Sequence, residues 1–154
     1  MAKPGLKPLA DLAQVVGALG VVISLIYVAV EVGQNTQALK AATFQAMAAQ
    51  SVEFGLRAVD DPEYGAFFTK AALTPESMTE LEQVRWNALL GAAFRQFESI
   101  QYQFSIGMLE PRMWQGYDRV ITRFASLPGS KQWWADNRIL YNDEFALYVD
   151  GVVE

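Results

Sequence analysis

The chain has 154 residues, carries 17 acidic against 12 basic side chains, and contains neither histidine nor cysteine. The acidic balance argues against nucleic-acid binding, because affinity for phosphate backbones comes mostly from clustered basic charge. The missing residue types exclude a histidine-assisted catalytic triad, zinc sites built on His and Cys, histidine-ligated haem and disulfides. We therefore expect no metal ion or cofactor and no enzymatic activity, since acid–base catalysis would lack its usual histidine.

The first predicted element is an apolar run over residues 12–30, LAQVVGALGVVISLIYVAV, which contains no charge. At about 1.5 Å per helical residue it reaches roughly 28 Å, close to the thickness of a bilayer's hydrocarbon core. A signal peptide is disfavoured, because its apolar region is normally shorter and no Ala-x-Ala cleavage signal follows here. The remaining alternative is a buried helix of a soluble protein, for which the rest of the chain offers little surrounding mass. We predict a tail over residues 1–11, a transmembrane helix over 12–30 and a helical domain beside the membrane over 31–154.

Small side chains recur along the predicted span at alternating spacings of four and three. Such a stripe lets helix backbones approach closely in lipid, where packing drives association. The alternative is that glycine and alanine are simply frequent in spans. The expected partners are membrane lipids and, through this stripe, other membrane proteins or copies of the same chain. The expected helix-packing residues are Ala13, Gly17, Gly20, Ser24 and Tyr27.

The helical pattern continues beyond the span without a proline as far as Arg57. This predicts one helix of about 45 residues from the start of the span, rich in good helix formers. The sequence DDPEYG, residues 60–65, then marks a boundary, with aspartate as a cap and Pro62 at a first helical position. A short helix is expected from there to about Ala72.

The next helix has the strongest local start signal in the chain. Two overlapping capping boxes, Ser77 with Glu80 and Thr79 with Glu82, predict a helix that runs from about residue 79 to Gly107, the C-terminal glycine.

Three further helices are expected, from Pro111 to near residue 126, within 127–140, and over 142–149. The long helices 31–57 and 79–106 should pack antiparallel while the shorter ones close the bundle. The predicted fold class is therefore all-α, with an N-terminal transmembrane helix that continues into a long helix packed in a small helical bundle.

Four short motifs give the chain a family resemblance: Gln34-Asn35-Thr36, Arg95 with Glu98, Gly107 with Leu109 before Trp114, and Pro128-Gly129 before Trp133-Trp134. With these motifs it resembles a large group of uncharacterised bacterial proteins that have one N-terminal span and a small helical domain. The resemblance covers almost the whole chain. The resemblance implies a protein of the bacterial inner membrane with one N-terminal span and a small helical domain. It does not imply a particular activity.

The orientation in the membrane stays open. The resembling proteins often carry several arginines around the QNT element, whereas this chain has only Lys40 there. Lys3 and Lys7 precede the span and slightly favour a cytoplasmic N-terminus, while the family pattern favours the reverse.

Charged and aromatic residues gather on the predicted helix 79–106. One interpretation is a partly buried pair of Arg95 and Glu98 that shapes a pocket for a lipid or quinone head group. The other, which we favour, is a structural ion pair, with Arg119 or Arg123 as possible additional members. The residues considered for the pocket or the pair are Arg95, Glu98, Trp86, Phe94, Phe97, Tyr102 and Trp114.

The adjacent Trp133 and Trp134 also have two interpretations, docking on lipid head groups or completing the core. The core is favoured, since neighbouring helical residues point some 100° apart and at most one of the two is expected to face outward.

The sequence predicts a non-enzymatic single-pass membrane protein, an accessory subunit or self-associating scaffold of a bacterial membrane assembly. The alternative is a membrane-anchored sensor or carrier that binds a hydrophobic small molecule, a lipid or a quinone, in its helical domain.

Overall fold

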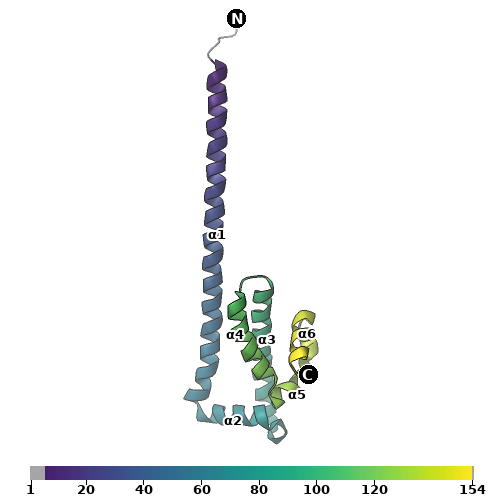
Figure 1. Ribbon diagram of the computed structural model, residues 1–154. Coiled ribbons are helices and arrows are strands. Elements are labelled where there is room, and N and C mark those ends of the chain that lie inside the picture. Colours follow the sequence, from purple (N-terminus) through teal and green to yellow (C-terminus); the bar gives the residue numbers. More distant parts are fainter. Residues whose placement is uncertain (1–5, 154) are drawn as a thin grey trace. The chain divides into compact units, whose positions relative to one another are not determined.

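The computed structural model describes the backbone of residues 6–153, and the side chains of that range except those of 6–8, 54 and 57–59. These residues form helices and no strand, which confirms the predicted all-α class (Figure 1). The chain divides into two compact units, residues 1–42 and 43–154, and the helix α1 belongs to both. The elements are α1 (Leu6–Asp60), α2 (Pro62–Leu73), the 3₁₀ turn η1 (Pro75–Ser77), α3 (Glu80–Ser105), α4 (Pro111–Ala125), α5 (Pro128–Asn137), the 3₁₀ turn η2 (Arg138–Leu140) and α6 (Asp143–Val153).

Helix α1 is longer than predicted at both ends, with 55 residues. It begins at Leu6, inside the predicted tail, of which residues 1–5 lie outside the described residues. Pro8 is tolerated there because the first turn of a helix has no partner for the backbone N–H that proline lacks. At the other end α1 stops at Asp60, because Pro62 disfavours a helical backbone at Asp61, whose φ and ψ are −125° and 99°.

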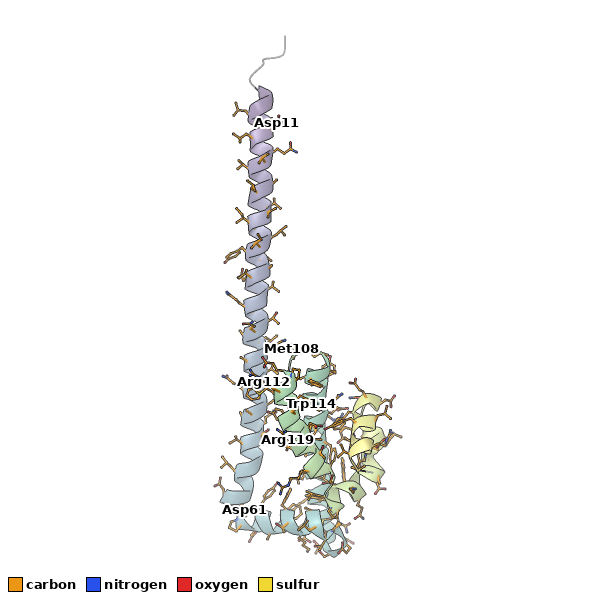
Figure 2. The ribbon with its side chains drawn as sticks, in the orientation of Figure 1. Asp11, Asp61, Met108, Arg112, Trp114 and Arg119 are labelled. Atoms are coloured by element: carbon orange, nitrogen blue, oxygen red, sulfur yellow. The ribbon has the colours of Figure 1, made fainter. Side chains whose placement is uncertain are left out.

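The apolar part of α1 is exposed. Among the described residues, Leu9–Glu53 holds the one helical segment long and apolar enough, by length and composition, to cross a membrane. None of its most apolar window is buried, in contrast to the core helix of a soluble protein. Large side chains there such as Leu12 and Tyr27 keep more than half of their surface exposed, and they project from all sides of the helix (Figure 2).

Only one of the two predicted capping boxes is present. The Thr79 N–H donates to Glu82 Oε2 (2.7 Å), and the Glu82 N–H donates to Thr79 Oγ1 (3.3 Å), so α3 begins immediately after Thr79. The Ser77–Glu80 box is wrong. Ser77 lies in η1, where its hydroxyl donates to the Thr74 carbonyl (2.7 Å), because the chain after Thr74 first completes a 3₁₀ turn.

The other helix ends follow the local signals closely. Gly107 has φ +74°, a left-handed conformation that costs glycine little, and the Met108 N–H donates to the Gln103 carbonyl (2.9 Å). Proline occupies the first turn of both α4 and α5. At α6, the Asn142 side chain accepts from the Phe145 N–H (2.9 Å) and caps the helix.

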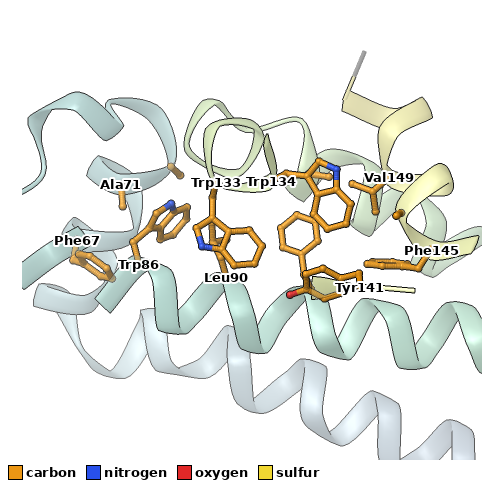
Figure 3. Close-up of a cluster of buried hydrophobic side chains, with 13 residues drawn as sticks. Phe67, Ala71, Trp86, Leu90, Trp133, Trp134, Tyr141, Phe145 and Val149 are labelled. Carbon is orange, nitrogen blue, oxygen red and sulfur yellow. The ribbon is translucent and has the colours of Figure 1, made fainter. Parts of the chain in front are cut away.

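The main core lies on one face of α3. Phe94 is fully buried at its centre and stacks on Trp133 (ring centroids 5.3 Å apart) and on Trp134 (5.0 Å). Both tryptophans are buried, as the core interpretation predicts. The other buried members of this cluster, most of which Figure 3 labels, are Phe67, Ala71, Ala72, Trp86, Leu90, Ala125, Tyr141, Phe145, Ala146 and Val149.

Helix α5 approaches α2 very closely at Gly129. An ideal Cβ on this glycine would lie 2.1 Å from the Ala71 carbonyl oxygen and 3.2 Å from Trp86 Nε1. The Trp86 indole N–H donates to the Gly129 carbonyl (3.3 Å). The close approach of α5 to α2 therefore requires glycine at position 129. This approach also brings the Gly129 carbonyl to the Trp86 indole.

The expected antiparallel packing of the two long helices is found over only a short part of their length. Within residues 43–60 of α1, Met47 is buried against Ile100 of α3 and Leu109, and Phe44 packs beside them. Residues 49–53, which follow, are exposed. The cause is α2, which runs crosswise from the end of α1 to the start of α3 and keeps the two helices apart there (Figure 1).

Candidate functional site

The Arg95–Glu98 pair forms as predicted, and its neighbours give it a structural role. Arg95 Nη1 bonds Glu98 Oε2, and Nη2 donates to the Leu140 carbonyl (3.1 Å). The other Glu98 oxygen accepts from the Asn142 backbone N–H (2.9 Å) and side-chain amide (2.8 Å). The Arg95 guanidinium also lies over the Tyr141 ring, 4.6 Å from its centroid. The pair thus fixes the turn between η2 and α6 on α3, and the described ion pairs of Glu98 include neither Arg119 nor Arg123.

The other aromatic residues of the predicted set do not meet in one pocket. Trp86 and Phe94 belong to the main core, whereas Tyr102 is 57% exposed. Trp114 of α4 stacks on Phe104, with ring centroids 4.7 Å apart. Phe97 alone of the set lines the cavity described next.

A cavity of about 1250 Å³ lies among residues 44–124, all within the second unit. It lies beside α2, between the last turns of α1 on one side and α3 with α4 on the other. Its walls are mainly apolar. The lining residues include Phe44, Ser51, Val52 and Glu53 of α1, Asp61, Glu63 and Tyr64 at α2, Arg85, Ala88, Ala92, Ala93, Gln96, Phe97 and Ile100 of α3, and Arg112, Met113, Tyr117 and Val120 of α4.

One face of helix α3 lines this cavity, and the opposite face packs in the main core. The residues from Arg85 to Ile100 that line the cavity recur at helical spacing, and alanines 88, 92 and 93 occupy the middle of that face. The aromatic face with Trp86 and Phe94 points to α5. The small cavity-side residues leave space where larger ones would fill it.

The width of the cavity follows from the length of α2. Lys70 of α2 forms an ion pair with Glu82 of α3 (2.7 Å), so the start of α3 is fixed near the far end of α2. Lys70 lies nine positions after Asp61, about 14 Å along a helix, whereas packed helix axes are about 8–10 Å apart. Because Met47 and Ile100 hold α1 against α3 at the other end, the space between them is wedge-shaped.

Tyr117 supplies a hydroxyl to the cavity. Burial raises the pKa of its phenol above the ordinary range, although a hydrogen bond with Ser51 acts in the opposite direction. The phenol therefore stays protonated at neutral pH. Because the Ser51 hydroxyl donates to the Met47 carbonyl (3.0 Å), the Tyr117 proton serves the contact with Ser51, and the phenol oxygen is left to accept. Among the described residues no group of three or more acidic side chains is placed to hold a metal ion.

Sequence reasoning missed this cavity, although one signal for it was present. The alternation of large and small residues along α3 is visible in the sequence, but alanines on a helix face usually indicate close packing rather than an opening. What opens the space is the crosswise course of α2, which no local pattern encodes.

Among the described residues, nothing packs closely on the two glycines of the predicted helix-packing stripe. An added Cβ at Gly17 or Gly20 meets nothing within 4 Å, so no contact within the chain requires these two glycines. Ala13, Ser24 and Tyr27 are exposed as well. The Ser24 hydroxyl donates to the Gly20 carbonyl (2.9 Å) and is satisfied within the helix. That a second helix packs on this stripe stays a prediction.

Comparison with known protein families, with characterised proteins and with solved structures finds no match to this chain.

Proposed function

We propose that the chain is a single-pass protein of a bacterial inner membrane that acts by binding rather than by catalysis, as an accessory subunit or a self-associating scaffold. The observation that carries the proposal is the exposure of the apolar half of α1. Between residues 12 and 30, twelve large apolar side chains keep more than half of their surface uncovered. At about 1.5–3 kcal/mol for each one buried, leaving them in water would forgo on the order of 20 kcal/mol. Lipid supplies that apolar surrounding.

The backbone and the few polar groups of this segment suit lipid. All backbone groups of a helix interior bond within the helix, as a spanning segment requires. The Ser24 hydroxyl also bonds within the helix. Residues 12–30 contain no charged side chain that would need a partner in the bilayer.

Single-cysteine labelling tests the span directly, because the natural chain has no cysteine. We would place one cysteine at Lys3 and, in a second variant, one at Ile139, which is 87% exposed. A membrane-impermeant maleimide applied to spheroplasts should label one variant and reach the other only after permeabilisation. The labelled variant also gives the orientation. Equal labelling of both before permeabilisation would contradict a single span.

The scaffold part of the proposal is tested on the small-residue stripe. Gly17→Leu combined with Gly20→Leu should abolish association in mild detergent, because leucine side chains keep a partner helix at a distance. Val15→Leu combined with Val22→Leu, on another side of the helix, is the matched control and should leave the assembly size unchanged. If the glycine variant and the control form the same assemblies, the stripe is not the interface.

The second candidate function is that of a membrane-anchored sensor or carrier of a hydrophobic small molecule. The cavity beside α2 favours it, since apolar walls with a few polar groups are typical of small-molecule sites.

A further inference from the structure

We infer that the cavity beside α2 binds an uncharged amphiphile, a molecule with an apolar chain and a neutral hydrogen-bonding head. This inference rests on the second candidate function above and gives it a site and a ligand class. Its location differs from the pocket expected around Trp86, Phe94 and Trp114, which the core and the Phe104 stack fill.

The narrow end of the cavity is apolar. Phe44 of α1, Ile100 of α3 and Met113 of α4 pack in the second hydrophobic cluster and close this end. Nearer the opening, Val52 and Val120 face the space from α1 and α4 with 59% and 57% of their surfaces exposed. An apolar chain seated there would cover this exposed surface and gain about 25 cal/mol for each Å² buried.

The charges around the cavity do not favour an ion. Asp61 accepts from the Glu63 and Tyr64 backbone N–H groups, and Arg112 bonds Glu110 (2.9 Å), so both are engaged within the chain. Glu53 also has an interaction within the protein.

The two further charges that line the cavity, Glu63 and Arg85, have opposite signs. An anionic or a cationic head would lose hydration on entry without gaining a net opposite charge, a cost that an uncharged head avoids.

Neutral polar groups are available to hold an uncharged head. The Tyr117 oxygen can accept, since its proton serves the contact with Ser51, and the Gln96 amide can both donate and accept. Both side chains are partly buried at the cavity wall. A small number of such groups in an otherwise apolar site sets a ligand's orientation.

The membrane can supply such a molecule because the cavity wall follows the proposed span in the same helix. Phe44 comes fourteen residues after Val30, the end of the apolar run. Uncharged amphiphiles partition into a bilayer, so a chain anchored there meets them at a higher concentration than a chain in water does.

Photolabelling of the full chain in lipid nanodiscs tests the inference. The probe is a long-chain alcohol with a diazirine in its chain, and cross-linked peptides are identified by mass spectrometry after digestion. We expect labels in residues 12–30, from ordinary lipid contact, and separately in the peptides that contain Ile100 and Met113. The label on the span is the internal standard for the probe.

A cavity-filling variant and its control make the test specific. Ala92→Phe places a ring into the cavity from an exposed position, so the cavity labels should fall at least five-fold relative to the span label. Ala135→Phe, at an exposed position of α5 away from the cavity, should leave both labels unchanged. Tyr117→Phe removes one hydrogen bond and should weaken cavity labelling by a few-fold.

Competition with three molecules of equal chain length decides the ligand class. Hexadecanol should displace the probe from the cavity, whereas hexadecanesulfonate and hexadecyltrimethylammonium should not. Displacement by either ion as strong as that by hexadecanol would overturn the uncharged class. Mass spectrometry of the organic extract of the purified protein then distinguishes an acylglycerol from a quinone as the natural source.

The possible failures are distinguishable. Labels in the span without labels in the cavity would overturn the ligand site and leave the membrane proposal intact. Cavity labels that persist in Ala92→Phe would overturn the site as well. The absence of any label over residues 12–30 would instead contradict the proposed span.

Discussion

Replacing Gly129 by alanine tests the closest contact in the fold. The added Cβ would lie 2.1 Å from the Ala71 carbonyl oxygen and 3.1 Å from its carbon, both backbone atoms that cannot rotate away. Helix α5 must therefore shift from α2. The shift also lengthens the hydrogen bond that the Trp86 indole donates to the Gly129 carbonyl.

The expected cost comes from two opposing sets of effects. Overpacking of a core contact typically destabilises by about 1–3 kcal/mol, and a weakened hydrogen bond adds up to about 1 kcal/mol. The higher helix propensity of alanine offsets less than about 1 kcal/mol of this cost, because position 129 lies in the first turn of α5. We expect a net loss of about 2 kcal/mol in the free energy of unfolding, by these magnitudes.

Urea unfolding of the full chain in a mild non-ionic detergent measures this loss. Tryptophan fluorescence reports the same region, since Trp86, Trp133 and Trp134 all belong to the main core. The midpoint should fall by about 1 M, for slopes typical of small domains. Gly151→Ala, where an added Cβ meets nothing within 4 Å, is the control and should be neutral or slightly stabilising. A Gly129→Ala midpoint equal to that of the control would refute the close-approach argument.

Two further predictions concern charged groups on α3. The hydrogen bond from Lys70, together with those from Thr79, lowers the pKa of Glu82 to about 2 from its ordinary 4.5. Because the pKa is lower in the folded state, this stabilisation is fully present above about pH 4.5 and is lost as the pH falls toward about 2. The wild-type unfolding midpoint should therefore fall more steeply across this pH range than the midpoint of Glu82→Gln. Parallel pH curves for the two proteins would show that protonation of Glu82 does not affect stability. At the other pair, Glu98→Ala leaves the Asn142 N–H groups without their acceptor and should cost about 1–3 kcal/mol. Arg95→Ala, with a side chain 59% exposed, should cost about 1 kcal/mol or less; urea unfolding measures both losses. Equal losses would mean that the exposed guanidinium stabilises the turn as much as the carboxylate does.

The local features of the fold were predictable from the sequence because each depends on neighbouring residues. The Thr79–Glu82 capping box marks the start of α3, and the left-handed backbone at Gly107 marks its end. The overlapping box at Ser77 was wrong for an equally local reason. Thr74 and Pro75 form a 3₁₀ turn first, and that turn occupies the Ser77 hydroxyl.

The candidate site could not be predicted in the same way, because its parts are distant in sequence. Glu98 finds its hydrogen-bond donors at Asn142, 44 residues away, and no spacing within α3 indicates them. The cavity depends on the angle at which α2 leaves α1 and on the contact between Met47 and Ile100. Sequence periodicity correctly marks which residues share a face of α3, but it does not say whether a second helix covers that face.

The two faces of α3 make folding and the inferred binding separable. On one face, Phe94 is fully buried among the rings of Trp133, Trp134 and Tyr141, so a change there alters stability first. On the other, Ala92 is exposed and lines the cavity, so a change there alters the cavity first. A domain built only to be stable would have larger residues on the second face, with α1 packed on it along its length. The alanines and the crosswise α2 together keep that surface uncovered, which is the arrangement expected if something other than this chain covers it.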